Sequence, residues 1–123
     1  MKIDIFNHFF PARFYEKVMA VAPEHKDLGK RVRNIPCLVD LDVRFKIMDE
    51  FGAYCQLLSL PGPPTEVFAG PDVSPELAGI GNDGLAELVA KYPDRFPGFI
   101  ASLPMNNPEA AVAEMHRAIN DLG

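Results

Sequence analysis

The apolar run at residues 54–60, Tyr-Cys-Gln-Leu-Leu-Ser-Leu, constrains the fold more than any other stretch of the chain. A short and mostly apolar run of this kind is typical of a β-strand that other elements cover on both faces. The sequence Pro-Gly-Pro-Pro at residues 61–64 then ends the strand, because proline cannot donate to the hydrogen-bond ladder of a sheet. Strands covered on both faces belong to parallel sheets with helices packed against them, so we expect an α/β fold.

Two helices are expected before this strand. Pro11 suits the first turn of a helix at residues 12–21, where apolar residues recur at helical spacing. Asp40 suits the N-cap of a second helix at residues 40–51. Residues 24–38 are polar and basic without a clear period, and we expect a long loop there.

The second half of the chain carries the same helix-start signal twice. An N-cap residue followed by proline occurs at residues 74–75 and again at residues 107–108. These signals predict helices at residues 74–91 and 107–122, with a strand at residues 96–104 between them. The apolar stripe of the last helix, its expected core face, consists of Val112, Met115, Ile119 and Leu122.

The first residues of the chain, 2–6, alternate polar and apolar as a strand does. In a closed barrel Ile3 and Ile5 would then face the surrounding helices. The side chains expected to point the other way, into the barrel mouth, are Asp4, Phe6 and His8. The order of strands and helices along the chain is that of parallel βα units with right-handed crossovers. An independent α/β sandwich of another topology is the alternative.

Residues 3–11, Ile-Asp-Ile-Phe-Asn-His-Phe-Phe-Pro, resemble the opening strand of the amidohydrolase superfamily, in the branch typified by aminocarboxymuconate-semialdehyde decarboxylase. Later blocks are similar to that branch in the same order, namely residues 42–52, 82–88, 92–96 and 104–123. The resemblance implies a TIM (β/α)8 barrel of the metal-dependent hydrolase type, which takes about 250 residues. Residues 1–123 would then form a single incomplete domain of about three βα units, which further strands or a second chain complete.

The branch usually reads Ile-Asp-x-His-x-His at this strand, and both histidines bind a catalytic divalent metal. The resemblance makes His8 a metal ligand at the second position and puts Phe6, which has no donor atom, in place of the first. Asp4 is expected to brace the strand or to support a ligand from behind. The implied cofactor is a divalent metal, zinc or manganese. The remaining ligands and the catalytic residues of the branch lie beyond residue 123, so no catalytic residue is assigned within the chain.

Arginines within residues 24–38 are the candidate substrate-binding residues. In this branch such loop arginines hold a substrate carboxylate, and the resemblance points to Arg33, with Arg31 nearby. An arginine that only contacts water is the alternative. His25, in the same stretch, could approach the barrel mouth, whereas His116 is expected on the surface of the last helix.

The charge balance limits the partners of the chain. With a net charge of −5, we expect neither a nucleic acid nor a membrane as a partner, because phosphate binding needs clustered Lys and Arg. No apolar run approaches the roughly 18 residues of a membrane span. Cys37 and Cys55 indicate reduced thiols in a cytoplasmic protein, with a disulfide between them as the alternative.

The resemblance implies two chemistries for the complete protein. A decarboxylase, which is a lyase, would release CO2 from a small carboxylated substrate. A hydrolase would use a metal-activated water on a carboxylated or cyclic one. A function of another class is a catalytically inactive barrel fragment or subunit with an assembly role, part of an oligomer or paired with a complementary chain, and Phe6 favours it.

Overall fold

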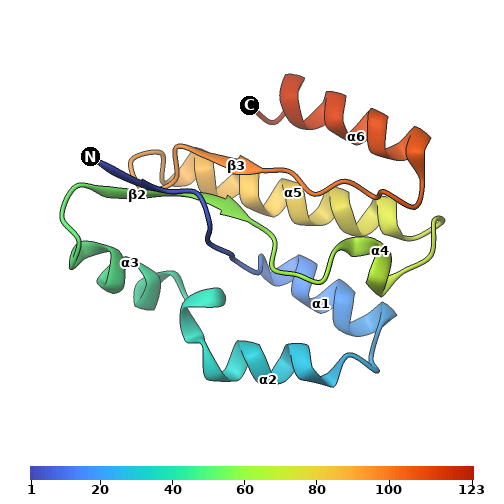
Figure 1. Ribbon diagram of the computed structural model, residues 1–123, viewed down its shortest axis with the longest axis horizontal. Coiled ribbons are helices and arrows are strands. Elements are labelled where there is room, and N and C mark those ends of the chain that lie inside the picture. The colour runs from blue at the N-terminus through green and yellow to red at the C-terminus, as the bar shows by residue number, and fades with distance from the viewer.

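The computed structural model describes residues 1–123, apart from the side chain of Lys26. Within these residues, three strands form a parallel sheet in the order β1-β2-β3. The strands are β1 Lys2–Asp4, β2 Tyr54–Ser59 and β3 Gly98–Ile100. Figure 1 shows β2 at the centre of the sheet, beside both the N-terminal segment and β3. The predicted α/β class with parallel βα units is confirmed.

Most helices begin close to where the sequence predicts. Asp40 Oδ1 accepts a hydrogen bond from the amide of Val43 at 3.0 Å, and Asn107 Oδ1 accepts one from the amide of Ala110 at 3.1 Å, so both predicted N-caps are confirmed. Ser74 lies just inside its helix instead of capping it. The helices are α1 Ala12–Val21, α2 Lys26–Asn34, the 3-10 turn η1 Pro36–Leu38, α3 Leu41–Asp49, α4 Thr65–Phe68, α5 Ser74–Lys91 and α6 Pro108–Asn120.

The prediction of a long loop at residues 24–38 was wrong, because α2 and η1 occupy most of this stretch. Leu28 is buried and Val32 packs against the core, so two apolar residues one turn apart hold α2 against the body of the protein. Asp27 in the first turn and arginines in the last turn also suit the helix dipole. The sequence shows no long apolar stripe here because a short helix needs only one such pair.

Two strands are shorter than predicted, and side-chain hydrogen bonds explain where they end. Asp4 Oδ1 accepts a hydrogen bond from the amide of Phe6 at 2.9 Å, which turns the chain out of the sheet after β1. Asn82 Nδ2 donates to the carbonyl of Ser102 at 2.9 Å, and Asn82 Oδ1 accepts from the amide of Ser102 at 2.8 Å. This side chain from α5 therefore takes the place of a neighbouring strand beyond β3.

The two faces of the sheet have different surroundings. The strand register pairs Ile3 with Cys55 and Ser59 with Ile100, which puts these four side chains on one face. Ile3 is 52% exposed and Ile100 is 50% exposed on that face. Leu58, on the opposite face, is fully buried in the core shared with the helices. We call the face that carries Ile3, Cys55, Ser59 and Ile100 the open face.

The side chains of β1 face the opposite way to the prediction. Ile3 lies on the open face and Ile5 is exposed, so neither isoleucine packs against a helix. The Asp4 carboxylate accepts a hydrogen bond from the Tyr54 hydroxyl at 2.7 Å, and the Tyr54 ring packs on Phe51 directly after α3. Strand alternation predicts which residues share a face, but it does not say which face the helices cover.

The apolar stripe that was expected to face the core on α6 faces outward. The exposed members are Val112, Met115 and Ile119. Polar contacts hold the other side of α6 on α5: Arg117 forms an ion pair with Asp83 at 2.6 Å, and Glu114 accepts a hydrogen bond from Asn82 at 2.6 Å. Among described residues, α6 therefore presents an exposed apolar stripe, while the apolar residues that it buries are the small Ala111 and Ala118.

Arg44 of α3 is a buried charge that ties the helix to the sheet. Its side chain is 5% exposed. Nε donates to the Cys37 carbonyl at 3.0 Å, Nη1 donates to Gln56 Oε1 at 2.6 Å and to Asn7 Oδ1 at 3.3 Å, and Nη2 donates to the His8 carbonyl. Burial lowers the pKa of this guanidinium from its ordinary value. All its hydrogen-bond acceptors are uncharged oxygens, so several of them together replace the water that the cation has lost.

Replacing Arg44 with methionine (Arg44→Met) should lower the free energy of unfolding by about 3 kcal/mol, because buried acceptors in η1, in β2 and after β1 lose their donor. Lys46→Met is the matched control, since Lys46 is exposed on the same helix, and it should change stability by less than about 0.5 kcal/mol. Urea unfolding followed by circular dichroism measures both. Equal losses in the two variants would show that the Arg44 contacts do not stabilise the fold.

A close approach between the start of α1 and the middle of α5 depends on Gly84. A Cβ atom at Gly84 would lie 2.4 Å from Pro11 Cβ and 2.8 Å from Pro11 Cγ, well inside contact distance. At Gly79, also in α5, a Cβ would meet only Arg117 Nη2 at 3.8 Å, which is ordinary contact. The same substitution therefore has opposite consequences at the two glycines.

Gly84→Ala should lower the free energy of unfolding by about 1–3 kcal/mol, because Pro11 and α1 must shift to admit the methyl group. Gly79→Ala should raise it by up to about 1 kcal/mol, because alanine favours the helix and meets no clash. Thermal unfolding of both variants beside the wild type measures the difference. A stabilising Gly84→Ala would contradict the close approach of α1 and α5.

Candidate functional site

His8 lies just beyond the end of β1, beside the end of β2. Three hydrogen bonds join Ser59, the last residue of β2, to residues 7–9. The Phe9 amide donates to the Ser59 carbonyl at 3.0 Å, the Ser59 hydroxyl donates to the Asn7 carbonyl at 2.7 Å, and His8 Nδ1 lies 2.8 Å from Ser59 Oγ. The imidazole is thus held at the carboxyl ends of parallel strands, on the side of Ser59 and the open face.

Phe6 and His8 lie side by side, as their spacing predicts. Their ring centroids are 5.3 Å apart in an edge-to-face arrangement, and Phe6 is 82% exposed. The phenyl ring contributes no donor atom, so position 6 offers a metal nothing. An apolar ring this exposed also lacks the packing that would explain it as a core residue.

Asp4 lies away from His8, on the helix-covered side of the sheet. Its carboxylate accepts hydrogen bonds from the Tyr54 hydroxyl and from the Phe6 amide. Burial raises the pKa of Tyr54, and its hydrogen bond to Asp4 adds to the rise, so the phenol stays protonated as the donor. Asp4 therefore braces the end of β1, and its role beside a metal stays a prediction.

The residues present fit a metal at one coordination position only. His8 has a second ring nitrogen, Nε2, that no other described group contacts by a hydrogen bond. Among the described side chains, no three His, Cys, Asp or Glu residues gather closely enough to hold a metal ion. A cavity of about 210 Å³ adjoins His8, Cys37 and Arg44. One imidazole nitrogen is what this chain can offer a divalent ion at the end of β1.

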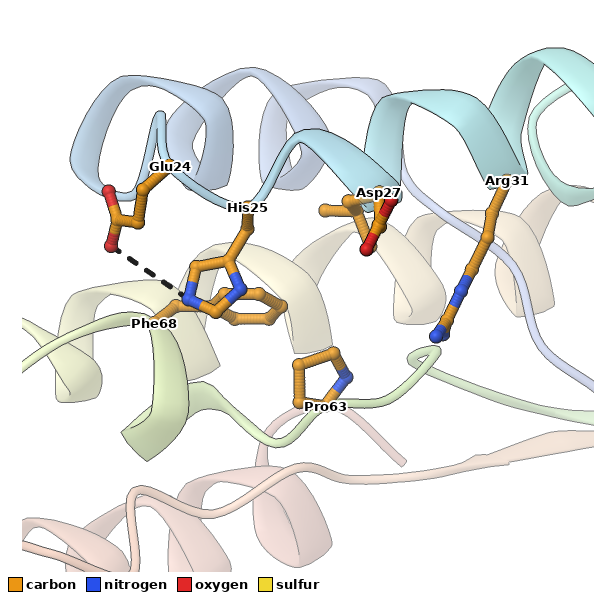
Figure 2. A pocket seen from close by; sticks show the side chains of 7 residues that line it. Glu24, His25, Asp27, Arg31, Pro63 and Phe68 are labelled. Atoms are coloured by element: carbon orange, nitrogen blue, oxygen red, sulfur yellow. Dashed lines mark ion pairs between the residues drawn. The ribbon is translucent and has the colours of Figure 1, made fainter.

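The stretch predicted to bind a substrate carboxylate forms part of a different pocket. This pocket, of about 270 Å³, lies between the start of α2 and the segment that follows β2. Figure 2 shows His25 and Arg31 on one side of it, with Pro63 and Phe68 on the other. Its lining residues are Glu24, His25, Asp27, Leu28, Arg31, Pro63 and Phe68.

Polar and aromatic groups meet in this pocket. His25 Nε2 lies 3.8 Å from Glu24 Oε1, and the His25 ring packs edge-to-face on Phe68 with centroids 5.2 Å apart. Arg31 lines the pocket, whereas Arg33 does not and is exposed at the end of α2. The structure brings neither arginine into the cavity beside His8, so the substrate-binding role of Arg33 stays a prediction.

The other predicted residues have simpler surroundings. His116 is exposed on α6, as expected. Cys37 and Cys55 are both free thiols. None of the helices in the described part of the chain is long and apolar enough to cross a membrane.

Sequence reasoning missed the two residues that hold His8 in place, Ser59 and Arg44. Ser59 is a hydroxyl residue at the end of the apolar strand run, and Arg44 is a cation one turn before the buried Met48 on the face of α3 that meets the sheet. A polar side chain at an otherwise apolar position is the available signal, because burial is tolerated only where partners exist.

Comparison with known proteins finds decarboxylases. The gamma-resorcylate decarboxylase of Polaromonas sp. (strain JS666) is 45% identical over 87 residues, which are 70% of this chain and 26% of that protein. The 2-amino-3-carboxymuconate-6-semialdehyde decarboxylase of Dictyostelium discoideum is 34% identical over 84 residues, 68% of this chain and 23% of that protein. No family model matches the chain.

A solved structure is similar over almost the whole chain. The crystal structure of dihydroxybenzoic acid decarboxylase from Polaromonas sp. JS666, with bound manganese and the inhibitor 2-nitroresorcinol, has a TM-score of 0.76 at 39% identity and matches 99% of this chain but 36% of its own. The chain spans about a quarter of the length of the curated relatives it matches. The chain belongs to the amidohydrolase superfamily, in the branch of aminocarboxymuconate-semialdehyde decarboxylase, and corresponds to the N-terminal part of its TIM (β/α)8 barrel.

Proposed function

We propose that this chain is the N-terminal segment of a metal-dependent decarboxylase that releases CO2 from a small carboxylated substrate. The observation that carries the proposal is His8, held by Ser59 at the carboxyl ends of the strands, where barrels of this kind place their active sites. The decarboxylase names of its relatives favour this chemistry over the hydrolase alternative. A hydroxybenzoate such as gamma-resorcylate, 2,6-dihydroxybenzoate, is the first substrate class to test.

The proposed metal is a divalent ion, and manganese in a similar solved structure supports it, with zinc as the other candidate. Such an ion would polarise an oxygen of the bound substrate. His8 would hold it through Nε2, because Nδ1 is engaged with Ser59. Residues outside 1–123 would supply the remaining ligands, and Asp4 would contribute by keeping the end of β1 in position.

The chain's own residues would bind and shield the substrate. The open face carries Ile3 and Ile100, whose apolar side chains would exclude water inside a closed barrel. Arg33, or Arg31 beside Phe68, would attract the substrate carboxylate from outside the cavity beside His8. We propose residues 1–123 as one incomplete domain of a cytoplasmic enzyme, completed by further barrel units in an oligomer or with a complementary chain.

The second candidate function is assembly without catalysis. Phe6, 82% exposed where the branch places its first metal ligand, favours it. The exposed isoleucines of the open face also suit a surface that another polypeptide covers. The two candidates differ in whether the protein binds a metal at His8.

In the whole protein that carries this segment, manganese should support the release of CO2 from 2,6-dihydroxybenzoate. His8→Ala should reduce both metal content and rate by at least about tenfold, because losing a direct ligand costs no less than losing a residue that supports one. His116→Ala is the control, since His116 is exposed on α6, and it should change neither. Metal analysis and a CO2-release assay on the same samples measure the effects. Full metal content in His8→Ala would rule out His8 as a ligand.

Phe6→His separates the decarboxylase from the assembly candidate. A second imidazole beside His8 should raise the affinity for manganese or zinc at least about tenfold if a metal site exists there. Phe6→Leu should leave the affinity unchanged, because it removes the ring without adding a donor. Isothermal titration with each ion measures the change. An affinity that stays equal in Phe6→His and Phe6→Leu would favour the assembly function.

A further inference from the structure

We propose that Ser59 is a positioning residue that fixes the tautomer of His8, with the proton on Nδ1 and the lone pair on Nε2. The use made of Nε2 by a metal rests on the proposed function, whereas the tautomer does not. Three atoms and the protons available to them decide the tautomer: Ser59 Oγ, the Asn7 carbonyl oxygen and His8 Nδ1.

The hydroxyl of Ser59 has two neighbours within hydrogen-bond distance. Its oxygen lies 2.7 Å from the Asn7 carbonyl oxygen and 2.8 Å from His8 Nδ1. A carbonyl oxygen carries no proton, so the short contact with Asn7 uses the only proton that a serine hydroxyl has. Ser59 Oγ can then only accept a hydrogen bond from the imidazole, and Nδ1 must be the protonated nitrogen.

The opposite tautomer would leave a polar group without a partner. If Nδ1 carried the lone pair, Ser59 would have to turn its proton toward the ring and away from the Asn7 carbonyl. Within the part of the chain that the structure describes, no other donor reaches that carbonyl. Asn7 is a buried residue, so an unmade hydrogen bond there is disfavoured.

Ser59 in β2 and Arg44 in α3 both hold the backbone around His8, which restricts the hydrogen-bond partners that the imidazole can reach. The Phe9 amide donates to the Ser59 carbonyl at 3.0 Å. From the helix side, Arg44 donates to the His8 carbonyl and, at 3.3 Å, to Asn7 Oδ1. These contacts hold the peptide group after His8 and the side chain of Asn7 before it, and leave the direction of the ring to Ser59.

In the proposed enzyme, the imidazole of His8 would already have the orientation and the free Nε2 lone pair that a metal ion needs. Histidine ligands usually donate their other ring N–H to a nearby acceptor, which orients the ring and fixes the tautomer. Ser59 supplies that acceptor here, and its own proton is committed to Asn7. A metal that binds Nε2 would need no transfer of a proton between the two ring nitrogens.

The test uses long-range 1H–15N correlation spectra of the metal-free, 15N-labelled protein at about pH 8.5, roughly two units above the usual histidine pKa. The spectra report which ring nitrogen is protonated. His25 and His116, the other two histidines, serve as internal references. In the wild type we expect His8 to be protonated on Nδ1.

Ser59→Ala should reduce the ratio of the Nδ1–H to the Nε2–H form of His8 at least about tenfold, which corresponds to about 1.4 kcal/mol. Ser59→Thr keeps the hydroxyl and should restore the wild-type spectrum. Ser102→Ala, the same change beyond β3 and away from His8, should have no effect. A purely structural role of Ser59 would not switch the tautomer.

A wild-type His8 protonated on Nε2 would overturn the inference, as would a Ser59→Ala variant with an unchanged tautomer. If Ser59→Ala does not fold, the wild type and Ser59→Thr decide, since both must show the Nδ1–H form. Because the sample holds no metal and no substrate, a failure of decarboxylation or of metal binding counts against the proposed function and leaves this result standing.

Discussion

The buried guanidinium of Arg44 joins four segments of the chain behind the candidate site. It reaches the carbonyl of Cys37 in η1, the side chain of Gln56 in β2, and Asn7 and His8 after β1, all from its own position in α3. Burying a cation has a large desolvation penalty, and uncharged acceptors offset it only when several of them are well placed together. The geometry around His8 is therefore set by a cation on the helix side of the sheet, with Ser59 acting from the other side.

The difference between the two faces of the sheet accounts for the unusual exposure of apolar residues. One face is buried by helices, whereas the open face leaves Ile3 and Ile100 half exposed. In a closed (β/α)8 barrel the inner face is filled by side chains from all strands, so apolar residues belong there. The outward stripe on α6 includes Ile119. α6 lies beside α5 (Figure 1), and a helix of a closed barrel also packs against the following unit, which would cover such a stripe.

Local signals predicted the elements well, and tertiary contacts decided the rest. The caps at Asp40 and Asn107 are short-range hydrogen bonds, so the sequence reveals them directly. The direction of Asp4 depends on Tyr54, fifty positions away, and the contact face of α6 depends on the polar bond between Asn82 and Glu114. No periodicity of apolar residues contains that information.

In the candidate site too, short-range signals are visible in the sequence and tertiary contacts are not. The resemblance identified His8 from its position in a short motif, but Ser59 became visible only when β1 and β2 were paired. Strand register decides which residues distant in sequence become neighbours. A shift of the register by one residue would turn each side chain of the strand to the other face of the sheet.

Phe6 and the hydrogen bonds around His8 favour different functions, the first assembly and the second chemistry. Phe6 removes one expected ligand and exposes an apolar ring, as a surface made for assembly would. An assembly surface gains nothing, however, from an imidazole whose Nδ1, adjacent carbonyls and following amide are bonded by Ser59 and Arg44. An apolar residue at position 8 would serve such a surface without needing these partners. The hydrogen bonds around His8 therefore favour a chemical role for its free nitrogen. In the proposed enzyme, the metal ligand missing at Phe6 would have to come from elsewhere in the barrel.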